Sequence, residues 1–351
     1  MSTTARRLPI QTRTSRRSGA DQHRLAHASN QSHPPGVRRG AVRALAVNLA
    51  VLLGLLALSG CGLGARPAPS AVQLVVSRDF GARILSQSGA RNVTGAETVM
   101  SLLAQSHSVA TRRGASFVQS IDGLSGGQEG GRRVDWLYYV NGVQAAMSAA
   151  ATSVHPGDHI WWDRHDWSQA REVPAVVGSF PEPFLNGLEG KRLPIRIECE
   201  SSSGYACSAV AERMRSLGIP AAIAAPGSGA GPHTLRVLVG TWQRLGADEA
   251  AREIAQGPHA SGVYARFSSE GRALALLGSD GRTRRTLGAG AGLIAATRHG
   301  EDAPAWIITG TDVGGVNLAA RSFTSAILHN RFAVALSSSG PLALPIAPTS
   351  R

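Results

Sequence analysis

A short run of histidines and aspartates offers candidates for metal chemistry in this 351-residue chain. Six such residues occupy twelve consecutive positions: His155, Asp158, His159, Asp163, His165 and Asp166. In an extended strand the side chains alternate between faces, so His159, Asp163 and His165 point the same way. Two imidazoles and a carboxylate could ligate the divalent metal of a hydrolase. The alternative is a polar strand end whose histidines meet water. Because no ligand from a second segment is identifiable, we assign no metal-binding residue.

Aromatic residues gather around the same segment and could line a ligand groove. Four of the six tryptophans and two of the four tyrosines fall within residues 136–167. The residues that we assign to ligand binding are Trp136, Tyr138, Tyr139, Trp161 and Trp162. Because side chains alternate along a strand, Trp136 and Tyr138 face one way and Tyr139 faces the other. We expect one set to pack in the core and the other to be free for binding.

Ser125 lies in a pattern that resembles a hydrolase nucleophile. Gly123-Leu124-Ser125-Gly126-Gly127 matches G-x-S-x-G, which works when a strand and a helix hold the serine at a strained turn. The sequence after it, QEGGR, does not begin such a helix. We therefore assign no catalytic residue and expect residues 123–131 to form a mobile loop.

Cys61 is the strongest candidate for covalent modification. An uncharged apolar run at 44–58 follows Arg38, Arg39 and Arg43 and leads into Leu58-Ser59-Gly60-Cys61. A basic region, a short apolar core and small residues are typical of a secretory signal peptide. The cysteine resembles that of a bacterial lipobox, which is acylated, for example with palmitate. The alternative, a membrane-spanning helix, needs roughly 20 apolar residues. We predict a lipid anchor on the extracytoplasmic face of the cell membrane.

Cys199 and Cys207 then remain as an even pair in an oxidising compartment. We expect a disulfide between them. The alternatives are two free thiols or a metal site, but two cysteines without nearby histidines make a poor zinc site.

The charge of the chain is concentrated in its first 60 residues. Those residues contain nine arginines and one acidic residue, which leaves 27 basic and 22 acidic residues in 61–351. Such a modest excess, with no basic stripe, does not indicate a nucleic-acid partner. Lys191 is the one lysine among 36 basic residues, which favours the high-GC genome of an actinobacterial source.

Composition divides the chain into six segments. Residues 1–36 form a disordered leader, or the start is assigned too far upstream; 37–60 form the lipoprotein signal peptide and 61–71 a tether. A first domain at 72–167 is joined by a proline-containing linker at 168–192 to a second domain at 193–340. We expect an α+β fold, with a small β-grasp-like domain followed by an α/β layered domain.

Local signals place the elements of these domains. In the first domain, Thr94 and Glu97 have capping-box spacing and predict a helix start, and Asn141-Gly142 predicts a tight hairpin. Strands are predicted at 72–76, 117–121, 136–140 and 159–163. In the second domain, strands alternate with helices, of which the last is predicted at 313–328.

Two sequence strings in the first domain carry a family resemblance. They are Trp136-Leu137-Tyr138-Tyr139-Val140-Asn141-Gly142 and Gly157-Asp158-His159-Ile160-Trp161-Trp162. Residues 72–167 resemble the transcobalamin-like C-terminal domain, a β-grasp-type module of bacterial surface lipoproteins. In the animal cobalamin carriers this module and a helical barrel enclose the corrinoid.

Together these observations predict a non-catalytic lipoprotein that binds a small ligand or a cell-surface partner through its first domain. The residues themselves indicate no cofactor, and the resemblance makes a corrinoid a candidate ligand. The alternative is a metal-dependent hydrolase of the cell envelope that uses the His/Asp cluster at 155–166.

Overall fold

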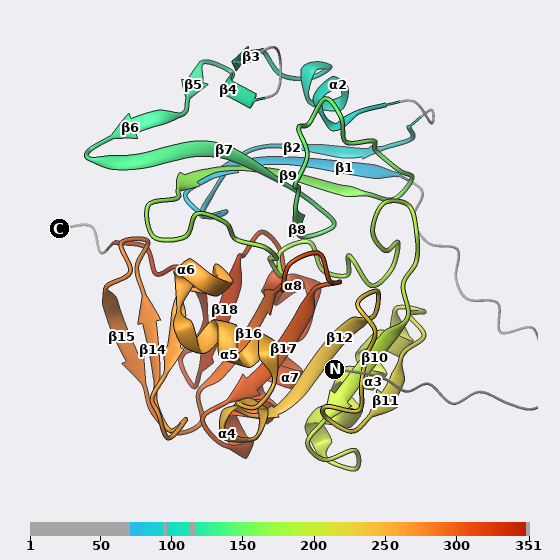
Figure 1. Ribbon diagram of the computed structural model, residues 1–351, viewed down its shortest axis with the longest axis vertical. Helices are drawn as coiled ribbons and strands as arrows, with labels where there is room; N and C mark the ends of the chain where they lie inside the picture. The colour runs from blue at the N-terminus through green and yellow to red at the C-terminus, as the bar shows by residue number, and fades with distance from the viewer. Residues whose placement is uncertain (1–70, 94–96, 113–116, 349–351) are drawn as a thin grey trace, which may run out of the picture. The chain divides into compact units, whose positions relative to one another are not determined.

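The computed structural model describes residues 71–93, 97–112 and 117–348, all within one compact unit, Gly64–Arg351. Helices and several sheets occur together, which confirms the α+β class. Residues 72–166 build the N-terminal sheet and residues 195–344 build the C-terminal sheet (Figure 1).

The described strands of the N-terminal sheet follow the order β2-β1-β9-β7-β6, and β8 pairs with β7. Their bounds are Val72–Arg78 for β1, Arg83–Arg91 for β2, Gly127–Glu129 for β6, Arg132–Val140 for β7, Val143–Gln144 for β8 and His159–Asp166 for β9. β1 runs parallel to β9 and antiparallel to β2. The predicted hairpin is confirmed, because Asn141 and Gly142 have φ of 53° and 79° and Val140 pairs with Val143.

A short helix and a small sheet cover one face of the N-terminal sheet. They are α2 (Val99–Ala104) and the strands β3 (Val109–Arg112), β4 (Phe117–Ile121) and β5 (Leu124–Ser125). The predicted helix start is wrong. Thr94 lies outside the described residues, and Thr98 and Ser101 form the capping box. Glu97 and Thr98 instead use their backbone to pair with Val154 and Ser153.

The predicted mobile loop at 123–131 is also corrected, because this segment contains β5 and β6. Gly126 donates its backbone N–H to Gln119, and Gly127 pairs with Val134 of β7. Edge pairing uses backbone groups alone, which glycine supplies as well as any other residue. Gly130 and Gly131, both with positive φ, form the turn between β6 and β7.

The described strands of the C-terminal sheet follow the order β11-β10-β12-β17-β16-β18-β19. Their bounds are Ile195–Cys199 for β10, Ala222–Ala224 for β11, Leu235–Thr241 for β12, Gly292–Thr297 for β16, Ala305–Gly310 for β17, Ala333–Ser337 for β18 and Gly340–Leu344 for β19. The pairs from β11 to β17 are parallel, and those from β17 to β19 are antiparallel. A separate antiparallel sheet contains β13 (Ala265–Phe267), β14 (Leu274–Leu277) and β15 (Thr283–Leu287).

Helices cover both faces of the C-terminal sheet. Their bounds are Tyr205–Ser216 for α3, Trp242–Leu245 for α4, Glu249–Gln256 for α5, Pro258–Ser261 for α6, Val313–Arg321 for α7 and Ser325–Leu328 for α8. α3 and α7 pack on one face through Val210 and Ala319, and α4 and α5 pack on the other through Leu245 and Ile254. The predicted helix at 313–328 is broken, because Phe323 turns inward against Phe180.

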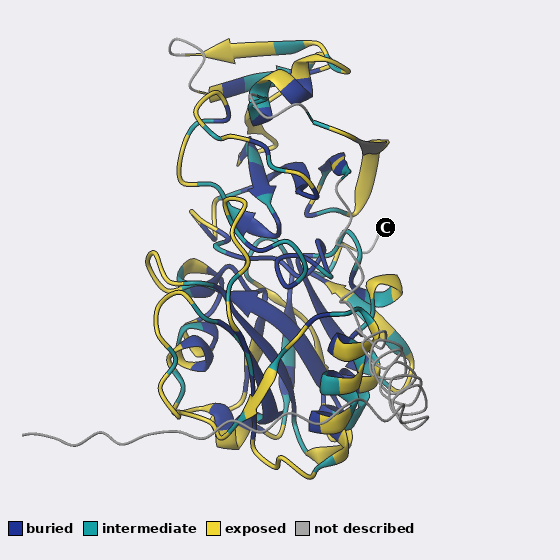
Figure 2. Cartoon of the chain, turned by 90° about the vertical axis from the view of Figure 1, so that its right-hand side faces the viewer, coloured by how far each residue is buried: buried dark blue, intermediate teal, exposed yellow. Residues whose placement is uncertain are grey.

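The two large sheets share a hydrophobic core. Along β9, Trp162 packs on the α2 side of the N-terminal sheet and Trp161 packs on the opposite side. The ring centroid of Phe332, from the second half of the chain, lies 5.1 Å from that of Trp161 and 5.4 Å from that of Tyr139. Figure 2 shows strands of both sheets buried among exposed loops and helix surfaces. Both faces of the N-terminal sheet are therefore covered.

The segment at 168–192, predicted as a linker from its prolines, packs into these cores. Val176 and Val177 are buried in the two different core clusters. The backbone N–H of Val177 donates to the carbonyl of Phe332 at 3.1 Å. A Cβ atom at Gly178 would lie 2.6 Å from the ring of Trp161, so only glycine fits there. The segment thus holds the two sheets against each other.

Candidate ligand-binding site

The five aromatic residues assigned to ligand binding divide between the two faces of the N-terminal sheet. We call the α2 side, with Trp136, Tyr138 and Trp162, the helix face, and the opposite side, with Tyr139 and Trp161, the junction face. All five side chains are buried, so the expectation that only one of the two sets packs in the core is wrong. The alternation expected along β7 is confirmed.

On the helix face the aromatic side chains border a cavity. The rings of Tyr138 and Trp162 stack with centroids 4.8 Å apart, and Trp136 Nε1 donates to the carbonyl of Leu124 at 2.8 Å. The Tyr138 hydroxyl donates to the carbonyl of Met147 at 2.7 Å. Beside these rings lies a cavity of about 270 Å³, the smaller pocket, which residues 144–149 also line.

On the junction face the aromatic side chains are enclosed by protein. Tyr139 and Trp161 are both 0 % exposed and contact Phe332. Trp161 Nε1 donates to the Ser77 hydroxyl at 2.7 Å, whereas the Tyr139 hydroxyl has no hydrogen-bond partner among the described residues. Burial and the nearby carboxylate of Asp163 raise the pKa of Tyr139 well above its usual value, so it stays protonated.

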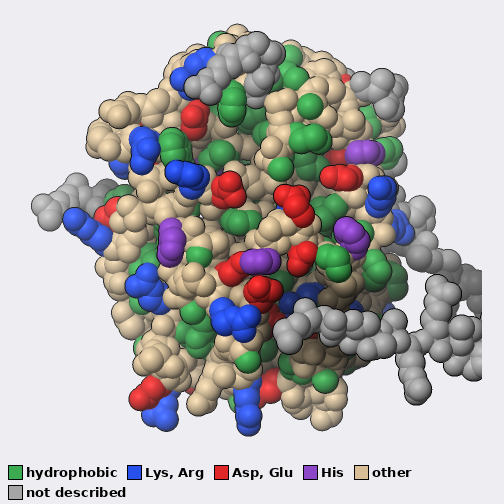
Figure 3. Space-filling view, viewed as in Figure 1, with side chains coloured by type: hydrophobic (Ala, Val, Ile, Leu, Met, Phe, Trp, Pro, Cys, Tyr) green, Lys and Arg blue, Asp and Glu red, His purple; other side chains and the backbone are tan. Residues whose placement is uncertain are grey.

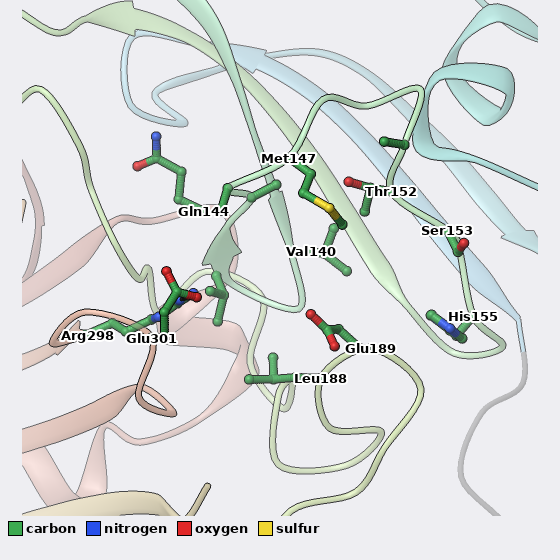
Figure 4. Close-up of a pocket in the computed structure, with 14 residues that line it drawn as sticks. Val140, Gln144, Met147, Thr152, Ser153, His155, Leu188, Glu189, Arg298 and Glu301 are labelled. Carbon is green, nitrogen blue, oxygen red and sulfur yellow. Dashed lines mark hydrogen bonds and ion pairs between the residues drawn. The ribbon is translucent and has the colours of Figure 1, made fainter. Parts of the chain in front are cut away.

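A larger pocket of about 560 Å³ adjoins the smaller one, and residues 144–147 line both. Its wall is drawn in Figure 4 and consists of Val140, Val143, Gln144, Ala145, Ala146, Met147, Ala151, Thr152, Ser153, His155, Leu188, Glu189, Arg298 and Glu301. Arg298 and Glu301 follow β16 of the C-terminal sheet. Both halves of the chain therefore contribute to this pocket.

Asn141 joins the segments that form the pocket wall. Its side-chain amide donates to Asp158 Oδ1 and to the carbonyl of Gly187, both at 2.8 Å, and its Oδ1 accepts from the backbone N–H of His159. The left-handed backbone of this residue suits asparagine, since its short polar side chain tolerates φ > 0. One buried amide thus fixes the hairpin turn, the turn before β9 and the segment that carries Glu189.

Glu189 occupies a tight turn in the wall of the larger pocket. Leu188 and Lys191 exchange both backbone hydrogen bonds, at 3.0 and 2.9 Å. Glu189 and Gly190 between them have φ of 51° and 71°, the pattern of a type I′ turn. A Cβ at Gly190 would lie 2.5 Å from the ring of His155, so this turn packs directly against the pocket wall. The backbone that presents Glu189 is therefore fixed.

The charged groups of the larger pocket are unequally paired. Arg298 binds Glu301 at 2.8 Å and donates from Nε to the carbonyl of Gly300 at 2.9 Å. No hydrogen bond or ion pair joins Glu189 to another described residue. In Figure 4 Glu189 lies in the middle of the lining, between Val140 and Leu188.

The carboxylates behind the pocket are held in an unusual state. Asp158 is 1 % exposed, and burial raises its pKa despite its hydrogen bonds to Asn141 and His155. Glu182 is buried beside it and accepts from the backbone N–H of Asn186 at 2.9 Å. Burial, together with the charge of Asp158, raises the pKa of Glu182 from its ordinary 4.5 to about 7. Burial also lowers the pKa of His159 to about 4, so this imidazole is neutral at pH 7.

The His/Asp cluster does not converge on one point. Asp163 serves the turn between β1 and β2, where it accepts from the backbone N–H groups of Phe80 and Gly81 at 3.0 and 2.8 Å. His165 Nδ1 lies 2.8 Å from Asp163, while His159 Nδ1 pairs with the Ser179 hydroxyl. Within the described ranges, no group of three His, Cys, Asp or Glu side chains is arranged to hold a metal ion.

The predicted disulfide between Cys199 and Cys207 is confirmed. Their Cα atoms are 5.8 Å apart, and the bond joins the end of β10 to the first turn of α3. Cys61, the predicted lipidation site, lies outside the described residues. In the part of the chain that the structure does describe, no helix is both long and apolar enough to cross a bilayer.

Comparison with protein families gives one match within the N-terminal half. Residues 96–166 match the model of a domain of unknown function, DUF4430. The match includes β7, β9 and the intervening loop, which supply most of the pocket wall. No curated protein matches the chain.

Sequence reasoning missed the charged half of the larger pocket. Glu189-Gly190 lies within the segment predicted as a linker, and of this pair only the glycine matches the Asn-Gly or Asp-Gly pattern that is typical of a type I′ turn. Arg298 and Glu301 gave no signal, because they reach the pocket only through the packing of the two sheets. Their i, i+3 spacing is common on any protein surface.

Proposed function

We propose that this protein is a lipid-anchored, extracytoplasmic binding protein without catalytic activity, and that its ligand is a small molecule held in the two adjoining pockets. The resemblance of residues 72–167 to the transcobalamin-like C-terminal domain supports a binding role. The family of the matched region has no known function, so the proposal rests on the geometry of the pockets.

The observation that carries this proposal is that residues 144–147 line both pockets. Their volumes, about 560 and 270 Å³, suit a drug-sized molecule, since ligand sites usually measure roughly 300–1,000 Å³. The lining is mainly apolar with a few polar groups, the usual composition of such sites. Asn141 and the paired turns hold this lining in place before any ligand arrives.

A blocking substitution tests the proposal directly. Ala146 lines both pockets and is exposed, so Ala146→Trp should fill them without disturbing the core. Ala150 lies in the same loop, is also exposed and lines neither pocket, so Ala150→Trp is the matched control.

The measurement is a ligand screen by tryptophan fluorescence, with corrinoids and soluble cell-wall fragments as the first two sets. Corrinoid titrations are corrected for the absorption of the corrinoid itself. We expect at least one compound to bind the wild type and the Ala150→Trp variant but not Ala146→Trp. Binding that survives in Ala146→Trp would place the ligand elsewhere, and failure of every set would remove the small-ligand proposal and leave a surface partner.

The membrane anchor is tested separately at Cys61. In the native host, Cys61→Ala should release the protein into the medium or trap the uncut precursor, because the acyl acceptor is gone. Fractionation and intact-mass analysis measure both outcomes. A variant that is processed and membrane-bound like the wild type would contradict the lipoprotein assignment.

A further inference from the structure

We propose that the larger pocket selects organic cations, in which an ammonium or guanidinium group is carried on an apolar body. This inference rests on the proposed function and deepens it, since it names the class of ligand. It is argued from the charges of the lining, from the fixed turn that presents Glu189 and from the acidic groups around the pocket mouth.

Glu189 carries the unpaired charge of the larger pocket. It has no partner among the described residues, and its backbone is fixed by a type I′ turn. A backbone that is fixed before binding lowers part of the entropic cost of pairing this side chain with a ligand. Its neighbours in the wall, Val140 and Leu188, offer apolar contact on either side (Figure 4).

Arg298, the arginine in the lining, is already paired. Arg298 binds Glu301 and the carbonyl of Gly300, so an anionic ligand would have to displace a carboxylate to reach it. The backbone N–H of His155 donates to the buried Asp158 at 2.7 Å, and its ring Nδ1 lies 3.5 Å from the same carboxylate without a hydrogen bond to any described residue. With Arg298 neutralised by Glu301, Glu189 sets the sign of the pocket.

The residues around Arg298 also make the environment of the pocket negative. His299, next to Arg298, lies against Glu253 at 2.7 Å and Glu249 at 3.7 Å. The hydrogen bond to Glu253 and the charge of Glu249 raise the pKa of His299, as expected in a negative environment. Figure 3 shows acidic side chains across the middle of the face drawn, with basic and histidine side chains among them.

The remainder of the wall suits the apolar body of such a ligand. Val143, Ala145, Ala151 and the thioether of Met147 line the pocket, and Met147 is 58 % exposed at its edge. An unbranched, polarisable side chain adapts to different apolar shapes. We therefore expect charge to be selected more strictly than the shape of the apolar group.

A set of three probes with one scaffold tests the inference on the purified full-length protein. Phenethylamine, phenethyl alcohol and hydrocinnamate share a phenyl group on a short chain and differ in charge. Isothermal titration calorimetry measures the affinity of each for the wild type, Glu189→Gln and Glu270→Gln. The last variant removes the same charge from an exposed residue outside the pocket.

We expect the amine to bind about fivefold more tightly than the alcohol, the gain typical of an exposed charge pair, and hydrocinnamate to bind most weakly. Glu189→Gln should reduce the amine to the affinity of the alcohol, and Glu270→Gln should change nothing. The advantage of the amine should also shrink as salt is added.

Equal binding of all three probes, or an amine preference that survives Glu189→Gln, would overturn the cation inference. If Ala146→Trp abolishes that unselective binding, the proposed function stands without charge selection. Absence of binding by all three probes also overturns the cation inference, and the ligand screen then decides the proposed function by itself.

Discussion

The helix face and the junction face of the N-terminal sheet bury similar aromatic side chains with different results. On the helix face, Trp136, Tyr138 and Trp162 border a cavity. On the junction face, Tyr139 and Trp161 contact Phe332 from the second half of the chain and are 0 % exposed. The same alternating strands thus border a cavity on one side and pack against the second half of the chain on the other.

The comparison shows why an aromatic cluster alone does not identify a binding surface. A sheet that is covered on both faces needs large apolar residues on both, and β7 and β9 supply them at 136–140 and 160–162. The helix face differs because the loop at 144–149 and the aromatic rings line a cavity between them. The packing of this loop, rather than the aromatic count, creates the cavity.

Replacing one tryptophan on each face should give the largest difference in stability between the two faces. Trp161→Ala should lower the free energy of unfolding by about 3–5 kcal/mol, because a large side chain is deleted from a closed core. Trp136→Ala should cost about 2 kcal/mol, because its ring already borders a cavity. Urea denaturation followed by circular dichroism measures both.

The same experiment tests the shared core. Because the junction face packs directly on the C-terminal half, we expect Trp161→Ala to unfold in a single transition at a lower midpoint. Two separate transitions, with only one of them shifted, would show that the halves are independent. Equal losses for Trp136→Ala and Trp161→Ala would remove the distinction between the faces.

The pH dependence of stability should reveal the buried carboxylate behind the pocket. The pKa of Glu182 is about 7 in the folded protein against 4.5 when exposed, so its protonated form favours folding. Its contribution is full below about pH 4.5 and is lost as the pH rises through 7, a change on the order of 3 kcal/mol. Glu182→Gln should therefore gain stability relative to wild type between pH 4.5 and pH 8.

The contribution of His159 to stability changes with pH in the opposite direction to that of Glu182. Its pKa of about 4 in the folded protein means that its contribution is present above about pH 6.5 and is lost as the pH falls through 4. Because both proteins contain His159, its titration cancels, and the stability difference between Glu182→Gln and the wild type should grow from about pH 4.5 to about pH 7 and stay constant above it. If the difference in the free energy of unfolding between variant and wild type stays constant from pH 4.5 to pH 8, the raised pKa of Glu182 is wrong.

The disulfide tests a region remote from both faces. The bond closes a loop with a sequence separation of 8, so replacing Cys199 and Cys207 together by serine should cost about 2–3 kcal/mol. Ligand binding should be unchanged, because neither cysteine lines a pocket. Alkylation of two thiols in unreduced native protein would contradict the bond itself.

Asn141→Gly should give the smallest loss of stability and a larger loss of binding. Glycine keeps the positive φ of the turn but removes the amide that ties the pocket segments together. We expect about 1–2 kcal/mol of destabilisation and weaker binding of any ligand found in the screen. Unaltered affinity in Asn141→Gly would show that the pocket does not depend on this amide.

Local sequence signals predicted the tight turn and the disulfide better than the points at which helices begin and end. Asn141-Gly142 was identified because the turn type demands positive φ, and the pair Cys199 and Cys207 because few cysteines were available. Thr94 failed as a helix start because Thr98 offers an equally good hydroxyl four residues later, and pairing with Ser153 decides between them. The break at Phe323 depends on Phe180, which is distant in sequence.

The candidate site was predictable only on the side formed by neighbouring residues. Trp136, Tyr138 and Trp162 belong to two strands whose alternation can be read directly. The rest of the larger pocket comes from 188–189 and 298–301, segments that meet only after the two sheets have packed. No local pattern encodes that meeting, so the charge of the pocket could not be anticipated.

The buried Asp163 also affects the order in which parts of the N-terminal sheet can fold. The turn at 79–81 holds three successive residues with positive φ, a costly arrangement that the Asp163 carboxylate stabilises by accepting from Phe80 and Gly81. That carboxylate follows the turn by more than 80 residues in the sequence. A chain made from its N-terminus must therefore leave its first hairpin unfinished until β9 arrives. The last strand of the N-terminal sheet completes its first turn, so this sheet depends on contacts that are distant in sequence, which are typical of slow folding.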